Sequence, residues 1–233
     1  MGDSAQNPFT EMVIRRLSCG YGSDFRLEIA ELAVPLSVPI VLKGSNGSGK
    51  TTLLKALAKL DGPERYDYEI TGSNGFYYVE QATEASVFLR LRVDECIMAM
   101  AEGRVSFLGF TRTSAEAFID FLRALPSQVR GEVEKFRHRF VEELSGGQRS
   151  LLGIAAAAIA GANCILLLDE PAAHLDFENR RLVASFISGL VAGGRAVWTV
   201  SHDEHFTALL DNHHTLMIEN GTVRNVFARK EVS

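Results

Sequence analysis

Apolar and polar residues alternate over two segments near the beginning of the chain, residues 12–17 and 26–32. Alternation with a period of two is typical of a strand that buries one face. Residues 20–23 read Gly-Tyr-Gly-Ser and predict a turn, so we expect the two segments to form an antiparallel pair. Residues 38–42 form a short apolar run that leads into a glycine-rich loop.

Strand-like and helix-like segments alternate through most of the remaining chain. The expected helices cover residues 50–60, 145–160, 177–191 and 204–210, and the expected strands cover residues 68–70, 76–79, 164–168, 196–200, 215–218 and 222–227. Between the strand expected at 76–79 and the helix expected at 145–160, the patterns are helical only. This stretch contains a helix at 93–101, a helical apolar face made of Phe118, Phe121, Leu122 and Leu125, and a charged segment at 132–139. We therefore expect an α/β fold with a mainly parallel sheet and an N-terminal antiparallel β subdomain. A helical subdomain (82–143) would interrupt one core (1–81 and 144–233).

The glycine-rich loop at residues 44–51 fits the phosphate-binding pattern G-x-x-x-x-G-K-[ST]. Its glycines would turn backbone N–H groups onto phosphate oxygens, and the following helix would add the positive end of its dipole. The alternative is a flexible Gly/Ser turn, but a strand before and a helix after are the context that the motif requires. The sequence thus predicts a P-loop NTPase core, with nucleotide-binding residues Gly44, Ser45, Asn46, Gly47, Ser48, Gly49, Lys50, Thr51 and Thr52.

Two carboxylates follow the apolar run at residues 165–168. An acid at a strand end is often only solvated, but an upstream phosphate loop makes Asp169 a candidate to hold Mg²⁺ together with Thr51. Glu170 would point to the other side of the strand, where it can polarise the attacking water. We predict Lys50 to reach the β- and γ-phosphates.

The motif Leu-Ser-Gly-Gly-Gln at residues 144–148 resembles the signature of the ATP-binding cassette (ABC) superfamily and lies shortly before the Asp-Glu strand, as in that family. An ordinary helix start capped by Ser145 is the alternative interpretation. As a signature, Ser145, Gly146, Gly147 and Gln148 would bind a γ-phosphate through a hydroxyl and a helix N-terminus.

The resemblance implies further roles. Tyr21 would stack on adenine, although a lone tyrosine in a turn is often only packing. Gln81 would sense Mg²⁺ and the attacking water, as a metal and catalytic residue. Asp176, in the Ala-His-Leu-Asp segment at 173–176, would lie in the loop that crosses to a second subunit, and His202 would contact the γ-phosphate as a catalytic residue beside Glu170, Gln81 and Lys50.

Two departures from the family pattern leave the subfamily and the substrate open. Residues 153–158 lack the arginine that many relatives carry after the signature, and the interval from Lys50 to Gln81 is short. Phe107, Leu108 and Phe110 could line a groove for a partner or belong to the subdomain core, and for the basic residues 135–139 a solvated helix face is the preferred interpretation.

The resemblance implies a head-to-tail dimer with two ATP molecules and Mg²⁺ at its interface, the second cassette being a copy or a relative. The leading prediction is the ATPase subunit of an ABC transporter, docked on a separate transmembrane permease through the helical subdomain. The alternative is a soluble ABC ATPase acting on ribosomes, nucleic acid or a protein assembly. A cassette that binds ATP without hydrolysis is disfavoured because all the catalytic groups are present.

Charge, cysteines and hydropathy indicate where the protein works and which partners it is not expected to bind. The net charge of −5 gives no reason to expect nucleic-acid binding, and Cys19, Cys96 and Cys164 form no disulfide or metal pattern. Residues 1–10 are polar and predict no signal peptide. The apolar run 151–168 is interrupted at 161–163 by Gly-Ala-Asn, so we expect a buried helix and a buried strand there rather than a membrane span. These features predict a cytoplasmic protein, peripheral on the membrane.

Overall fold

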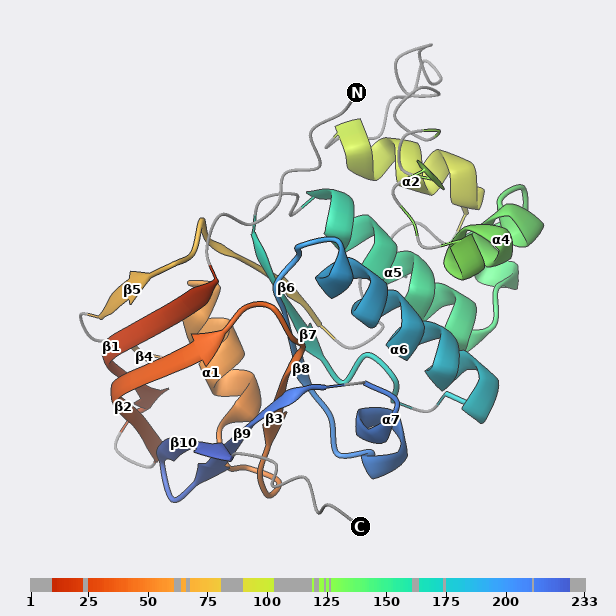
Figure 1. Cartoon of the computed structure of the whole chain (residues 1–233). Coiled ribbons are helices and arrows are strands. Elements are labelled where there is room, and N and C mark those ends of the chain that lie inside the picture. Colours follow the sequence, from red (N-terminus) through yellow and green to blue (C-terminus); the bar gives the residue numbers. More distant parts are fainter. Residues whose placement is uncertain are drawn as a thin grey trace.

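A mixed sheet with helices on both faces forms the body of the protein (Figure 1). The structure is a computed structural model, and it describes residues 10–22, 25–60, 64–65, 68–80, 90–102, 119, 122–123, 125, 127–160, 164–173, 175–210 and 212–226. Gln81, His174, Phe107, Leu108, Phe110, Phe118 and Phe121, all named above, lie outside the described residues.

Ten strands in the described part of the chain form one sheet in the order β4-β1-β2-β10-β9-β3-β8-β7-β6, with β5 paired to β1. Their bounds are β1 Glu11–Tyr21, β2 Phe25–Pro35, β3 Ile40–Lys43, β4 Glu64–Arg65, β5 Glu69–Thr71, β6 Phe76–Val79, β7 Ile165–Asp169, β8 Val197–Val200, β9 His214–Glu219 and β10 Thr222–Val226. The strands β9, β3, β8, β7 and β6 run parallel, whereas β1 pairs antiparallel with β2, β4 and β5. The predicted fold class is confirmed.

The first two strands are longer than the alternation predicts, and their pairing reaches Tyr21↔Phe25. Gly20 and Tyr21 are therefore strand residues and not part of the predicted turn. A Cβ at Gly20 would lie 2.0 Å from the carbonyl oxygen of Phe25, so this rung of the hairpin accepts only glycine. The side-chain phase also changes within β1, at Arg16, whose φ is +56°.

Six helices and a 3₁₀ turn are found in the described residues. They are α1 Lys50–Leu57, α2 Val93–Glu102, α4 Ser127–Phe136, α5 Gly146–Ala160, α6 Phe177–Ala192 and α7 Glu204–Ala208, with the 3₁₀ helix at Val141–Glu143. Helix α1 ends earlier than predicted, because Lys59 adopts a left-handed φ of +57° that an α-helix cannot continue. The charged segment predicted at 132–139 is only partly a solvated face, since Phe136 is buried.

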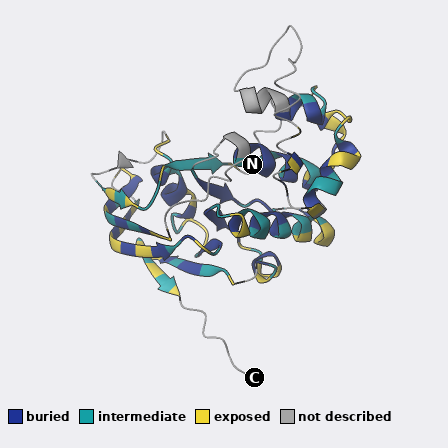
Figure 2. Cartoon of the chain, turned by 45° about the horizontal axis from the view of Figure 1, so that its top comes forward, coloured by how far each residue is buried: buried dark blue, intermediate teal, exposed yellow. Residues whose placement is uncertain are grey.

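Two apolar clusters cover the opposite faces of the sheet. One holds α1 against the β1–β2 hairpin, and the other holds α2, α4, α5 and α6. Strands β7 and β8 are buried at every residue, and Figure 2 shows the buried residues concentrated where the sheet meets its helices. The apolar run at 151–168 contributes to α5 and β7, as predicted. Among the described residues, no helix combines the length and the apolarity needed to cross a membrane.

Candidate functional site

The glycine-rich loop connects β3 to α1 and has a backbone that excludes side chains at two positions. Gly44 has a φ of +154°, and a Cβ there would lie 2.5 Å from the carbonyl oxygen of Ile218. Gly49 has a φ of +102°, and its Cβ would lie 2.3 Å from the ring of Phe25. No side chain caps the N-terminus of α1, so the backbone N–H groups of its first turn are available to an anion.

Two polar groups of the loop fit a phosphate. Lys50 is buried, and its Nζ donates to the carbonyl oxygens of Gly44 (3.0 Å) and Ser45 (2.8 Å). Burial lowers the pKa of Lys50, while the nearby carboxylates Glu170 and Asp169 raise it. The buried Ser48 hydroxyl has no hydrogen-bond partner among the described residues. A buried polar group without a partner is costly, and a phosphate oxygen would satisfy it.

The predicted metal residues Thr51 and Asp169 meet across the sheet edge. The Thr51 hydroxyl donates to Oδ2 of Asp169 at 2.8 Å, and Asp169 is buried. The described residues contain no cluster of three or more His, Cys, Asp and Glu side chains that could hold a metal ion. The Thr51 hydroxyl and the Asp169 carboxylate fit Mg²⁺, which usually takes one or two protein oxygens together with several waters and substrate phosphates.

Sequence reasoning missed Tyr78, whose hydroxyl also donates to Oδ2 of Asp169, at 3.0 Å. Tyr78 lies on β6, which runs parallel to β7 and pairs Tyr78 with Leu167, two residues before Asp169. Residues two apart on a strand share a face, so this pairing places the phenol beside the carboxylate. The available signal was the phenol hydroxyl of a tyrosine within the strand expected at residues 76–79.

Glu170 turns away from Asp169 and meets His202. Its φ is +52°, and its backbone N–H donates to the carbonyl oxygen of Val200 at 3.1 Å. Oε1 of Glu170 lies 3.4 Å from Nε2 of His202, which follows β8. Burial raises the pKa of Glu170, and the neighbouring His202 partly offsets that increase. The two predicted catalytic side chains are therefore brought together at the carboxyl ends of β7 and β8.

The signature motif forms the N-terminus of α5, on the face of the sheet opposite α1 (Figure 1). Ser145 and Gln148 cap this helix reciprocally: the Ser145 N–H donates to Oε1 of Gln148 (3.1 Å), and the Gln148 N–H donates to Oγ of Ser145 (3.2 Å). The ordinary capping role considered above is therefore present. Because Ser145 is exposed, its hydroxyl also lies at the surface.

Asn179 connects the signature to the acid of the predicted crossing loop. Asp176 caps α6 and accepts hydrogen bonds from the backbone N–H and from Nδ2 of Asn179, both at 2.9 Å. A Cβ at Gly147 would lie 2.2 Å from Cγ of Asn179, whereas a Cβ at Gly146 would meet nothing within 4 Å. The sequence motif does not reveal this difference between the two glycines.

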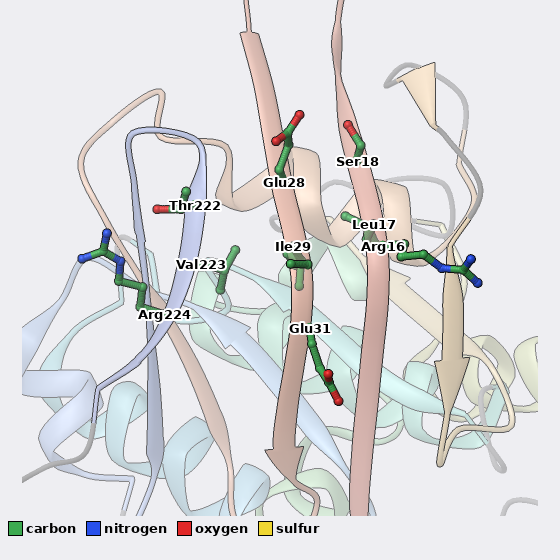
Figure 3. A pocket seen from close by; sticks show the side chains of 10 residues that line it. Arg16, Leu17, Ser18, Glu28, Ile29, Glu31, Thr222, Val223 and Arg224 are labelled. Atoms are coloured by element: carbon green, nitrogen blue, oxygen red, sulfur yellow. The ribbon is translucent and has the colours of Figure 1, made fainter.

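Tyr21 ends β1 and is 45% exposed, so a planar base could stack on its ring. A separate cleft of about 500 Å³ lies on the outer side of β1, β2 and β10. It opens because β10 and β2 share only the pair Thr222↔Glu28. In Figure 3 its two cations, Arg16 and Arg224, point away from each other. Among the described lining residues, these two guanidinium groups therefore do not form a common anion site.

Known proteins match this chain in sequence and in fold. The family model for ABC transporters matches residues 27–173, more than half of the chain. The macrolide export ATP-binding/permease protein MacB of Chlorobium luteolum is 30% identical over 193 residues, which cover 76% of this chain and 27% of MacB. The Fe(3+) ions import ATP-binding protein FbpC of Escherichia coli is 28% identical over 179 residues, which cover 76% of this chain and 49% of FbpC. The chain thus spans about a quarter and about half of these relatives.

A solved dimeric ATP-binding cassette, captured after hydrolysis with ADP and phosphate, superposes with a TM-score of 0.65 at 17% identity. The match covers 94% of this chain and 99% of that one, so the two share a fold over nearly their whole length. Together with the phosphate loop, the acid pair and the signature, the match to the family model leads to one conclusion. This chain is an ATP-binding cassette of the ABC transporter family.

Proposed function

We propose that this chain binds Mg-ATP and hydrolyses it as one half of a head-to-tail dimer, and so powers a conformational change in a separate transmembrane permease. The observation that carries the proposal is the convergence at one sheet edge of the phosphate loop, the Thr51–Asp169 pair and the Glu170–His202 pair. Gln81 lies outside the described residues, and the proposal keeps its predicted role as a metal and catalytic residue.

The residues of this edge have complementary roles. The backbone of Gly44, Ser45, Asn46, Gly47, Ser48 and Gly49, with Lys50 and Thr52, holds the phosphates. Thr51 and Asp169 hold Mg²⁺, which neutralises charge that develops on the transferred phosphoryl group. Glu170 orients and deprotonates the attacking water, and a raised pKa brings a carboxylate closer to the pH at which it works as a base. His202 holds the side chain of Glu170 and donates to the γ-phosphate.

The dimer follows from where the signature lies. Helix α1 and helix α5 pack on opposite faces of the same sheet, so the signature residues of one chain face away from its own phosphate loop. A second cassette, rotated head to tail, supplies Ser145, Gly146, Gly147 and Gln148 to the γ-phosphate, with Asp176 in the crossing loop. This surface fits a second copy of the chain or a related cassette.

The division into a core (1–81 and 144–233) and a helical subdomain (82–143) carries over as part of the proposal, with the permease docked on the subdomain. The subdomain is tied to the core through α2, which packs on α5. Dimer closure therefore moves the signature helix and the docking surface together. MacB and FbpC belong by name to an exporter and an importer, so the proposal specifies no direction of transport. The chain would work peripherally on the cytoplasmic face of the membrane.

The proposal is tested with the substitution Glu170→Gln, which keeps size and hydrogen bonding and removes the base. We expect this variant to bind ATP, to lose at least about 100-fold in turnover and to accumulate as an ATP-bound dimer in light scattering after gel filtration. Glu219→Gln, a change at an exposed site at the end of β9, is the control and should hydrolyse normally.

The trapped dimer also identifies the partner. Affinity capture of Glu170→Gln with Mg-ATP from solubilised membranes and from cytosol should yield a multi-span membrane protein in the membrane fraction alone. Ribosomal proteins, or another soluble assembly with no membrane protein, would replace the transporter proposal with the soluble alternative. Unchanged turnover in Glu170→Gln would remove Glu170 from the mechanism.

A further inference from the structure

The hydroxyl of Tyr78 contacts the carboxylate predicted to hold the metal. Two hydroxyl groups donate to the same oxygen, Oδ2 of Asp169: Thr51 at 2.8 Å from α1 and Tyr78 at 3.0 Å from β6. Two donors from different elements restrict the rotation of the carboxylate about its χ2 bond, which is otherwise broad. Asp169 is thereby held in one orientation before any ligand arrives.

The phenol keeps its proton and therefore acts as the donor in this contact. A tyrosine hydroxyl ordinarily has a pKa of about 10, so it is protonated at neutral pH and can donate. Charge-assisted hydrogen bonds of this kind are about twice as strong as neutral ones, and a carboxylate cannot donate in return. The geometry and the electrostatics thus agree on the direction of the hydrogen bond.

The ring of Tyr78 is itself held in place. Nζ of Lys55, on α1, lies 5.9 Å from the centroid of the Tyr78 ring. The same Nζ lies 3.2 Å from Oε1 of Glu80, which comes two residues after Tyr78. The side chain of Tyr78 also packs against the apolar cluster that contains the buried residues of α1. Packing alone would require only an aromatic ring, and phenylalanine would satisfy it. The hydroxyl is the part of the side chain that packing does not explain.

We propose that Tyr78 is a positioning residue of the magnesium site, acting through Asp169. Residues that orient the ligands of a metal change its affinity by about 10-fold to 100-fold when removed. Tyr78 also lies three residues before Gln81, so it ties the strand that leads to that glutamine to the metal carboxylate. This inference rests on the proposed function, because it requires that the nucleotide binds with Mg²⁺.

The substitution Tyr78→Phe removes the hydroxyl and keeps the ring. The probe is a fluorescent ADP derivative titrated with MgCl₂, and the readout is the Mg²⁺ concentration that gives half of the Mg²⁺-dependent binding. We expect this concentration to rise about tenfold in Tyr78→Phe, while binding of the probe in EDTA is unchanged. A purely structural role would weaken both. Tyr68→Phe is the matched control, since it also removes a phenol hydroxyl, one that donates to the carbonyl oxygen of Ala56 on α1 at 3.4 Å.

A double-mutant cycle with Asp169→Asn decides whether Tyr78 acts through this carboxylate. The effect of Tyr78→Phe should disappear in the Asp169→Asn background, because the proposed contact is already altered there. The inference would be refuted if the half-saturating Mg²⁺ concentration of Tyr78→Phe stayed within twofold of wild type. An effect of Tyr78→Phe that is equally large in the wild-type and Asp169→Asn backgrounds would also refute it. Nucleotide binding by the wild-type chain that does not depend on Mg²⁺ would count against the proposed function instead.

Discussion

Glu170 combines an unusual backbone with an unusual side-chain environment. A non-glycine residue at a φ of +52° costs about 1–3 kcal/mol, and such residues gather at functional sites. At this left-handed residue the two consecutive carboxylates have different partners, since Asp169 contacts Thr51 and Glu170 contacts His202. The molecule thus carries local strain where two charged groups need different surroundings.

The raised pKa of Glu170 predicts how stability depends on pH. Its charged form is penalised in the folded state, so stability is highest below the ordinary pKa of glutamate and falls as pH rises through the raised folded pKa. Glu170→Gln removes this penalty and should unfold at a higher urea concentration than wild type at pH 7. The advantage should shrink as the pH is lowered toward 4.

Urea denaturation of the nucleotide-free chains at both pH values provides the measurement. Glu219→Gln, at an exposed position, should match wild type throughout. Equal midpoints for Glu170→Gln and wild type at pH 7 would show that ionised Glu170 carries no net penalty in the folded state.

At the scale of elements, the contact of α5 with α6 couples two functional motifs within one chain. Gly147, on α5, lies against Asn179, on α6, and Asn179 in turn holds Asp176. The Ser150 hydroxyl adds a second link, donating to the carbonyl oxygen of Pro171 in the loop after β7. We therefore expect a shift of the signature helix to move the predicted crossing loop of the same subunit as well.

This contact predicts that the two signature glycines differ. Gly147→Ala should lower the free energy of unfolding by about 1–3 kcal/mol, because its Cβ would overlap Asn179. Gly146→Ala is the matched control and should cost less, since it meets open space. Adding Asn179→Ala to Gly147→Ala should recover part of the loss, although Asn179→Ala alone removes a side-chain hydrogen bond to Asp176. Strictly additive losses in chemical denaturation would contradict the overlap.

Elements differed in how far their sequence could predict them. The phosphate loop, the acid pair and the signature were predictable because each is a contiguous motif whose chemistry depends on order and spacing. Strand β1 was longer than predicted because its buried residues change phase, from Met12 and Ile14 to Leu17 and Cys19, across the left-handed residue Arg16. Tyr78 and Asn179 were missed because their partners are distant along the chain and adjacent only in the fold.

At the scale of the whole molecule, the sheet separates the two half-sites. Because the signature of one chain cannot complete its own phosphate loop, we expect turnover per chain to fall as the protein is diluted below the dimer dissociation constant. ATPase assays over a dilution series, read against light scattering at the same concentrations, measure this dependence. Turnover per chain that stays constant down to monomeric concentrations would show that one cassette is sufficient.

One rung of the β1–β2 hairpin has a consequence for ligand choice. Tyr21, the proposed base contact, pairs in register with Phe25, whose ring lies against Gly49 of the phosphate loop. The residue proposed to contact the base and the residue that packs on the phosphate loop are therefore partners in a single cross-strand pair. With Tyr21 stacked on the base as proposed, this pair fixes the separation between the base contact and the phosphate loop. We therefore expect the site to select ligands by the distance between their aromatic ring and their phosphates.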